Sequence, residues 1–410
     1  MPLEFRQSPR STLGVEWELQ LIDSDSSNLR QCGDFVISEV ERRYPKQKLI
    51  HKEMLLNTVE LVSRPRQRVA ECISDLKEAL AMVDPITKPL RIDLATAGSH
   101  PFANPIHQQV TDNKRYAKLV ERTQYWGRQM LLFGTHVHVG IEQRSKVLPI
   151  MNYVLTKSGH IQALTAASPY WAGIDTGYAD NRAMVFQQLP TAGTPRQFSK
   201  WQDLEAYTED CMKTSIISSF DEIRWDIRPS PKLGTIEVRV ADASSNLKEV
   251  GALAALVHSL VEYASRQLDA GRELPQLPAW YVGENKWRSA RYGIEAVIIE
   301  DAAGNELPLR DSIPTLLDML EPVAADLGCA KELRAWEDIV KIGVGYERQR
   351  QVQAKYHDLE AIVELMRAEM NAGHPISPAD FIFSGRGDHP LLPSGQKTSH
   401  NCEPEAAPRC

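Results

Sequence analysis

The chain has 410 residues, of which 42% are hydrophobic and 25% charged, and its formal net charge is −7. This composition is typical of a globular protein with enough apolar residues for a core. The negative charge argues against a nucleic-acid partner, which requires a basic face. The sequence contains neither a run of about 18 apolar residues that would predict a membrane span nor an apolar signal-peptide segment at its start. We therefore expect a cytoplasmic protein.

The cysteines are scattered along the chain and form no CxxC pair. They are Cys32, Cys72, Cys211, Cys329, Cys402 and Cys410. This spacing predicts reduced thiols, as in cytosolic proteins, and neither a disulfide framework nor a zinc cage. We expect buried thiols at the first four positions and an exposed thiol at Cys410.

Short segments in which polar and apolar residues alternate predict β-strands. In chain order they cover residues 12–23, 57–63, 91–98, 134–141 and 234–242. Longer segments with apolar residues three and four positions apart predict helices between and after these strands. The predicted helices cover about 66–83, 112–131, 145–167, 246–270, 285–300 and 346–372.

Two features mark boundaries near the C-terminal half. Asn246 is a suitable N-cap for the helix predicted over 246–270, and Glu249 three residues later completes a pair that resembles a capping box. From about residue 373 the sequence becomes rich in Pro, Gly and Ser, which predicts a mobile tail. We divide the chain into one folded unit, 1–372, and a tail, 373–410, with Phe381, Ile382 and Phe383 as candidates for docking.

The alternation within the strands indicates the kind of sheet. Strands separated by helices usually predict a parallel sheet, but buried parallel strands have continuous apolar runs. Strands that alternate instead favour an antiparallel sheet with one packed face and one polar face. The sequence therefore predicts an α+β fold with a mainly antiparallel sheet.

Four of the predicted strands place ionisable side chains on one face. Residues two apart on a strand share a face, so the apolar neighbours point to the other side. The shared pairs are Glu16 and Glu18, Thr58 and Glu60, His136 and His138, and Glu237 and Arg239. For any single strand, an ordinary solvated face explains such alternation equally well. These faces, however, carry Glu, His and Arg and no Lys.

If the four faces coincide, several carboxylates crowd together. Like charges at short distance repel and raise one another's pKa unless a cation lies among them. The cluster therefore indicates a divalent metal site, and its many carboxylate oxygens favour Mg²⁺ or Mn²⁺ over Zn²⁺. Arg239 beside Glu237 could stabilise a phosphoryl group during transfer.

Other functions fit parts of the pattern. The sequence has no P-loop and no kinase-type glycine-rich loop, so an ATP site must be of another kind. A zinc-type amide hydrolase could use His136 and His138 as ligands, although no second ligand-like histidine pair is present. A non-enzymatic binding protein would leave the Glu, His and Arg cluster without a reason.

Six blocks in order resemble the glutamate–cysteine ligase type 2 family, also called carboxylate–amine ligases. They are "LGVEWELQLID", "NTVELVS", "GTHVHVGI", "SPYWAGIDTGYADNRAMVFQQLPTAGTP", "WDIRPSPKLGTIEVRVAD" and "ENKWRSARYGIEA". The resemblance covers roughly residues 12–370 and makes 1–372 a single catalytic domain. It implies a glutamine synthetase-like fold, in which an antiparallel sheet curves into a half-barrel with helices on its outer face.

The resemblance also implies a reaction. ATP phosphorylates a carboxylate, typically the γ-carboxyl of glutamate, and an amine attacks the acyl phosphate to give an amide, ADP and phosphate. The implied cofactors are ATP and roughly two or three Mg²⁺ ions, for which Mn²⁺ can substitute. The partners are then small-molecule carboxylate and amine substrates, with a homodimer as the expected assembly. A catalytically idle nucleotide-binding relative is the remaining alternative.

Residue by residue, the resemblance assigns roles to the cluster. The implied metal ligands are Glu16, Glu18, Glu60, His138 and Glu237. His136 is expected to hydrogen-bond either a metal ligand or the substrate. Arg239 matches a phosphate-contacting arginine and, with Glu237, belongs to the implied catalytic set.

Further arginines match the family blocks less specifically. Arg182 resembles a catalytic clamp on the substrate carboxylate, because a guanidinium binds carboxylates bidentately. Arg228, Arg288 and Arg291 are the other candidates for nucleotide contacts. Surface salt bridges are the alternative for Arg182 and Arg228, and a solvated helix face is the alternative for Arg288 and Arg291.

Overall fold

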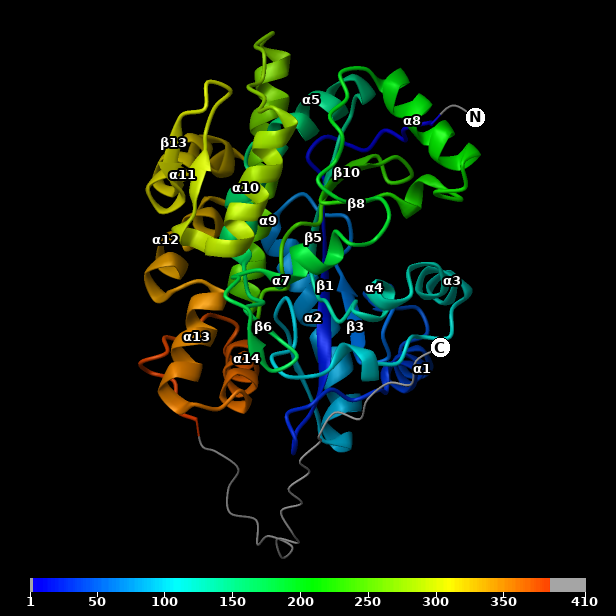
Figure 1. Ribbon diagram of the computed structural model, residues 1–410, viewed down its shortest axis with the longest axis vertical. Coiled ribbons are helices and arrows are strands. Elements are labelled where there is room, and N and C mark those ends of the chain that lie inside the picture. Colours follow the sequence, from blue (N-terminus) through cyan, green and yellow to red (C-terminus); the bar gives the residue numbers. More distant parts are fainter. Residues whose placement is uncertain (1–2, 384–410) are drawn as a thin grey trace, which may run out of the picture.

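An open sheet lies at the centre of the protein, whose computed structural model describes residues 3–383 (Figure 1). Within that range the sheet has seven strands, in the order β10-β11-β5-β1-β3-β2, and β4 pairs with β1 beside this path. The strands are β1 (Leu13–Asp23), β2 (Ile50–Lys52), β3 (Thr58–Val62), β4 (Ile92–Ala95), β5 (Thr135–Gly140), β10 (Ile227–Ser230) and β11 (Thr235–Val238).

All neighbouring strands of this sheet are antiparallel. Three small two-stranded sheets accompany it, and one of them is parallel. Their strands are β6 (Tyr170–Trp171), β7 (Ile174–Asp175), β8 (Ala192–Gly193), β9 (Arg224–Trp225), β12 (Val297–Ile299) and β13 (Glu306–Pro308). The predicted fold class is confirmed: it is α+β, with a curved and mainly antiparallel sheet.

In the view of Figure 1, helices lie on both the left and the right of the sheet. α10 to α14 lie on the left of the view, and α3, α4 and α8 lie on the right. The α-helices of the described range are α1 (Gly33–Arg43), α2 (Val69–Thr87), α3 (Lys114–Thr123), α4 (Tyr125–Arg128), α5 (Arg144–Leu155), α6 (Ser158–Thr165), α7 (Asn181–Phe186), α8 (Trp201–Lys213), α9 (Leu247–Asp269), α10 (Ala279–Tyr292), α11 (Leu309–Asp326), α12 (Ala330–Ile342), α13 (Gly345–Tyr356) and α14 (Glu360–Ala372).

The apolar face of the sheet forms the main core. Val15, Trp17 and Leu19 of β1 are fully buried, as are Val59 and Leu61 of β3 and the valines and isoleucine of β5 and β11. They pack in one cluster with buried residues of α2, α5 and α9. Burial of an aliphatic or aromatic side chain contributes about 1.5–3 kcal/mol, so this packing fixes which face of each strand points away from the helices.

Several predicted helices have different bounds in the structure. The helix predicted over 285–300 begins earlier and ends at Tyr292, because Gly293 has a φ of +59°, and residues 297–299 form β12 instead. The helices predicted over 145–167 and 346–372 are each broken in two. In the second, His357 adopts a left-handed conformation with a φ of +56°.

The sequence patterns missed α1, α7, α8, α11 and α12. α11 illustrates the reason: Pro314 and Pro322 lie within it, and proline usually ends or kinks a helix. Its apolar side is nevertheless buried against α9 and α12. Tertiary packing therefore offsets an unfavourable local preference.

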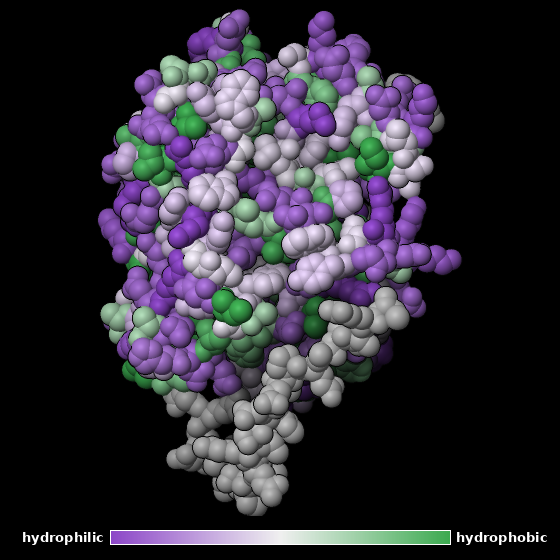
Figure 2. Space-filling model, viewed as in Figure 1, coloured by the Kyte–Doolittle hydropathy of each residue, from purple (hydrophilic) through white to green (hydrophobic). Residues whose placement is uncertain are grey.

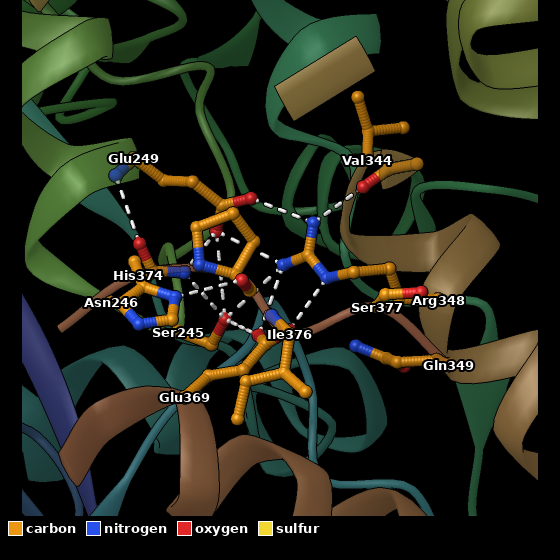
Figure 3. A network of polar contacts seen from close by, with 12 residues as sticks. Ser245, Asn246, Glu249, Val344, Arg348, Gln349, Glu369, His374, Ile376 and Ser377 are labelled. Carbon is orange, nitrogen blue, oxygen red and sulfur yellow. Dashed lines mark hydrogen bonds and ion pairs between the residues drawn. The ribbon is translucent and has the colours of Figure 1, made fainter. Parts of the chain in front are cut away.

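The predicted cap of α9 is confirmed and leads into a buried polar network. Asn246 Oδ1 accepts a hydrogen bond from the Glu249 backbone N–H at 3.0 Å. The guanidinium of Arg348 lies between the carboxylates of Glu249 and Glu369, with Ser245 beside them (Figure 3). Arg348 is 1% exposed, so this network joins α9, α13 and α14 inside the protein.

The described part of the predicted tail packs against the last two helices. Phe381 is buried and makes an edge contact with the ring of Tyr356, and Phe383 packs on the same ring. Ile382 is 83% exposed. Residues 384–410 lie outside the described residues, and the division of the chain at residue 372 stays a prediction.

The four cysteines of the described range have free thiols, as predicted. Cys72, Cys211 and Cys329 are buried, but Cys32 is partly exposed, so the prediction of a buried thiol was wrong there. Cys402 and Cys410 lie outside the described residues.

None of the described helices combines the length and the apolar character that crossing a membrane requires. On the face drawn in Figure 2, apolar residues are scattered among hydrophilic ones.

Candidate active site

The order of the strands brings the four ionisable faces together. β11, β5, β1 and β3 are consecutive neighbours in the sheet. Their register places His138 opposite Glu237, Glu16 opposite His136, and Glu18 opposite Glu60. Because the register is in phase, the predicted faces coincide on the side of the sheet away from the core.

A cavity of about 260 Å³ opens over this polar face. One part of its wall is apolar and includes Leu119, Leu132 and Phe186. The other part is charged and comprises Glu16, Glu18, Glu53, Glu60, His136, Arg182, Asp221, Arg224, Arg228 and Arg239. A concave site with convergent charged groups is the usual form of a small-molecule site.

Glu16 joins the two histidines of β5. Its carboxylate oxygens lie 3.0 Å from His136 Nδ1 and 3.1 Å from His138 Nε2. Burial alone would raise the pKa of Glu16, but the charge of His138 and the hydrogen bonds of both rings lower it well below its usual range. Burial and the charge of Arg239 together lower the pKa of His136 to about 4.

His138 differs from His136 in its surroundings. Its Nε2 also lies 3.8 Å from an oxygen of Glu237, and its Nδ1 lies 3.0 Å from the hydroxyl of Thr235. Burial would lower the pKa of His138, but Glu237 and Glu16 raise it overall. Both histidines therefore lie against carboxylates, but only His138 bridges two of them.

Glu237 carries two arginine partners. Arg228 Nε donates to one of its oxygens at 2.7 Å, and Arg239 donates to the other. Burial would raise the pKa of Glu237, but the charges of Arg239, His138 and Arg228 lower it far below its usual range. Glu237 is therefore ionised and neutralised within the protein.

The neighbouring carboxylates have no such partners at hydrogen-bond distance among the described residues. Oxygens of Glu18, Glu53 and Glu60 lie within 4.8 Å of one another. Burial and the charge of Glu53 raise the pKa of Glu18 to about 8. Burial and the charges of Glu16 and Glu53 raise the pKa of Glu60 well above its usual range. These carboxyls therefore retain protons to higher pH than usual, and a bound cation would favour their ionised form.

Glu53 was not predicted from the sequence. It follows the three-residue strand β2, in which His51 pairs with Glu60 of β3. Because residues two apart share a face, Glu53 continues the polar face on that side. A strand of only three residues gives too short a pattern to recognise, and the position could have been found only from its nearness to the β3 block.

The described residues contain three groups that could hold a metal ion. They are Glu16–His138–Glu237, Glu16–Glu60–His136 and Glu18–Glu53–Glu60, each with ligand atoms within 4.8 Å of one another. Carboxylate oxygens dominate all three groups, which fits hard divalent cations such as Mg²⁺ and Mn²⁺. The five predicted metal ligands all belong to these groups. His136 belongs to one of them as well, so its role stays open between ligand and support.

Arg182 reaches the site from the first turn of α7. Its Nη2 lies 3.3 Å from His136 Nε2, and its Nη1 donates to the Arg239 carbonyl at 3.1 Å. A Cβ on Gly134 would lie 2.2 Å from Arg182 Nη2. The glycine at the start of the β5 block is therefore required by the close approach of this guanidinium.

The remaining predicted arginines lie in two different places in the structure. Arg228 lines the cavity with Arg239, but Arg288 and Arg291 on α10 do not. Arg288 binds Glu284 at 2.8 Å and Glu306 at 2.7 Å. Arg291 donates to the Gly177 carbonyl and lies over the ring of Tyr292. Both side chains therefore make local contacts away from the cavity, and their role in nucleotide binding stays a prediction. Arg224, which was not predicted, lines the cavity.

The sequence matches the family model of glutamate–cysteine ligase family 2 over residues 12–368. A protein of Arthrobacter sp. strain FB24, provisionally named glutamate–cysteine ligase 2-1, is 49% identical over 380 residues, which are 91% of this chain and 99% of that protein. A protein of Mycobacterium tuberculosis strain H37Rv, provisionally named glutamate–cysteine ligase 2, is 51% identical over 369 residues, which are 90% and 97% of the two chains.

Two solved structures share the fold at low sequence identity. Glutamate–cysteine ligase of Francisella tularensis, determined in complex with AMP, gives a TM-score of 0.64 at 14% identity and covers 92% of this chain and 91% of its own. A bifunctional glutathione synthetase of Pasteurella multocida gives 0.60 at 14% identity, covering 89% of this chain and 53% of its own.

Proposed function

Because the chain belongs to glutamate–cysteine ligase family 2, we propose that it is an ATP- and Mg²⁺-dependent carboxylate–amine ligase. It phosphorylates a carboxylate and condenses the acyl phosphate with an amine, which forms an amide and releases ADP and phosphate. The names of its relatives make the γ-carboxyl of glutamate the first donor to test and cysteine the first acceptor.

One observation supports the proposal most strongly. Glu18, Glu53 and Glu60 crowd at one end of the cavity without a cationic partner at hydrogen-bond distance among the described residues. Such crowding is costly unless a cation lies among the carboxylates. A ligase that brings ATP and a carboxylate together needs this arrangement, because bound Mg²⁺ screens the repulsion between the two anions.

In the proposed reaction, each residue of the site has a role that suits its chemistry. Glu16, Glu18, Glu53, Glu60, His138 and Glu237 hold the divalent cations. Arg239, whose buried Nε has no hydrogen-bond partner among the described residues, stabilises the transferred phosphoryl group.

The remaining three residues of the set support these groups. Arg182 binds the donor carboxylate, and Arg228 holds Glu237 in place at 2.7 Å. His136 orients Glu16 through a 3.0 Å contact.

The experiment measures ADP release by the full chain with Mg²⁺ or Mn²⁺ and a panel of amino-acid donors and amine acceptors. We expect release that requires donor, acceptor and metal together. Glu18→Gln and Arg239→Ala should each lower the rate by about 10²–10³-fold, the loss typical of removing one transition-state contact. Glu41→Gln, a change on the exposed side of α1, is the matched control and should leave the rate unchanged.

Two outcomes contradict the proposal. Near-normal ADP release by both folded variants would remove these residues from the reaction. Nucleotide binding by the wild-type protein without ADP release, with every donor and acceptor tested, would favour a catalytically idle relative instead. Thermal unfolding of each variant shows whether a lost rate comes from a lost fold.

A further inference from the structure

α3 contributes part of the wall of the cavity. Tyr116 and Leu119 on its inner side line the cavity. On the other side, Arg122 donates to the Ile216 carbonyl at 2.6 Å and Lys118 lies 3.4 Å from the Ser218 hydroxyl. One short helix therefore bridges from the rim near β2 to the segment before β9, and in Figure 1 it lies with α4 between α8 and α1.

The attachment of α3 is slight. Among the described helices and strands, only α4 packs closely against it. The joint between the two helices is Gln124, whose φ of +47° and ψ of −113° are rare for a residue other than glycine, and such a conformation costs about 1–3 kcal/mol. A helix with few buried contacts opens more easily than the core, so α3 depends on the few contacts that it makes.

One of these contacts reaches the carboxylate cluster. The Tyr116 hydroxyl donates to Glu53 Oε2 at 3.2 Å, and the Met54 backbone N–H donates to the same oxygen. A carboxylate can accept hydrogen bonds on one oxygen and bind a cation with the other. Glu53 therefore connects α3 with Glu18 and Glu60, whose oxygens lie within 4.8 Å of its own.

We propose that Tyr116 is a positioning residue through which a divalent cation holds α3 over the cavity. A cation bound by Glu18, Glu53 and Glu60 fixes the Glu53 carboxylate and with it the acceptor of the Tyr116 hydrogen bond. The closed α3 excludes water from the site, which matters because an acyl phosphate hydrolyses in water. Without the cation, α3 is released and the cavity is open to substrates.

The coupling must work in both directions. If the bound cation favours the closed position of α3 by some factor, then closure of α3 raises the affinity for the cation by the same factor. Contacts that hold α3 closed should therefore strengthen cation binding. Arg122 is not among the described residues that line the cavity and donates to the Ile216 carbonyl instead, so we expect it to influence the cation through α3. This inference rests on the cation site of the proposed function, and its test separates the two.

The test measures hydrogen exchange of residues 114–123 in the full chain, with and without Mn²⁺ and without nucleotide. Electron paramagnetic resonance gives the Mn²⁺ affinity of the same samples. In the wild-type protein, Mn²⁺ should slow the exchange of α3 by about ten-fold, as expected for one hydrogen bond to a charged group. Tyr116→Phe should abolish this protection and weaken Mn²⁺ binding by about 3–10-fold.

Two further variants make the result specific. Tyr125→Phe changes an exposed tyrosine on α4 and should behave as the wild-type protein. Arg122→Ala should speed the exchange of α3 and weaken Mn²⁺ binding by the same factor. Equal exchange of α3 with and without bound Mn²⁺ overturns the inference and leaves the cation site intact. Absence of Mn²⁺ binding to the wild-type protein overturns both the cation site and the inference.

Discussion

Two buried groups of glutamates in this protein differ in how their charge is balanced. Around Arg348, the carboxylates of Glu249 and Glu369 each bind the guanidinium at 2.7–2.8 Å (Figure 3). In the cavity, by contrast, Glu18 and Glu60 face each other across two strands without a guanidinium at such a distance among the described residues.

The difference separates a structural role from a binding role. Carboxylates that are paired inside the protein require no ligand, and their network joins three helices. Unpaired carboxylates are retained at a cost in stability, which a bound cation removes. Burial of glutamates alone does not indicate a metal site; the missing positive partner is the observation on which the proposed site rests.

The largest effect is expected when the carboxylates around Arg348 lose their guanidinium partner. Arg348→Met should lower the free energy of unfolding by about 3–5 kcal/mol, because it leaves two buried carboxylates without a partner. Urea unfolding measures the change. The triple variant Arg348→Met, Glu249→Gln, Glu369→Gln removes the stranded charges as well and should recover most of the loss. A loss below about 1 kcal/mol in the single variant would show that the network does not depend on the ion pairs.

The carboxylates of the cavity, which lack a guanidinium partner, should respond in the opposite way: removing one of them should stabilise the metal-free protein. In metal-free protein, Glu60→Gln should raise the free energy of unfolding by about 1–3 kcal/mol, because it removes a crowded buried carboxylate, and it should weaken Mn²⁺ binding. Calorimetry in a chelator and Mn²⁺ titration measure the two effects. Glu41→Gln on α1 is the control, and a destabilised Glu60→Gln protein would contradict the comparison.

The same group predicts a dependence on pH. Glu18 keeps its proton in the folded protein up to about pH 8, whereas its unfolded pKa is 4.5. Between these values the folded state binds the extra proton, so the free energy of unfolding of metal-free protein should fall as the pH rises, by at most about 1.4 kcal/mol per pH unit. Unfolding curves from pH 5 to pH 8 test this. Saturating Mg²⁺ should flatten the slope, and an equally steep slope with Mg²⁺ would contradict it.

The smallest effect is expected on the surface. Arg288 pairs with Glu284 and Glu306 but is partly exposed, and such pairs contribute about 0–1 kcal/mol. Arg288→Ala should change the free energy of unfolding within that range and leave the rate of ADP release within about two-fold. A large loss of nucleotide affinity would restore the role that the sequence predicted for this arginine.

The sequence by itself determined the polar floor of the site. Alternation in the β1, β3, β5 and β11 segments depends only on the period of an extended chain, so it predicted which side chains share a face. Asn246 and Glu249 marked the start of α9 for the same reason: a helix cap is formed by residues that are close in the sequence.

Only the tertiary structure decided how these faces meet and which charges are balanced. The register between strands that are far apart in the chain placed Glu18 opposite Glu60, and the fold carried Arg182 to Gly134 and Glu53 to the cluster. Arg288 and Arg291 belong to a block that resembles the family, yet their side chains bind local partners away from the cavity. Contacts of this kind depend on distances in space, which local spacing in the sequence does not contain.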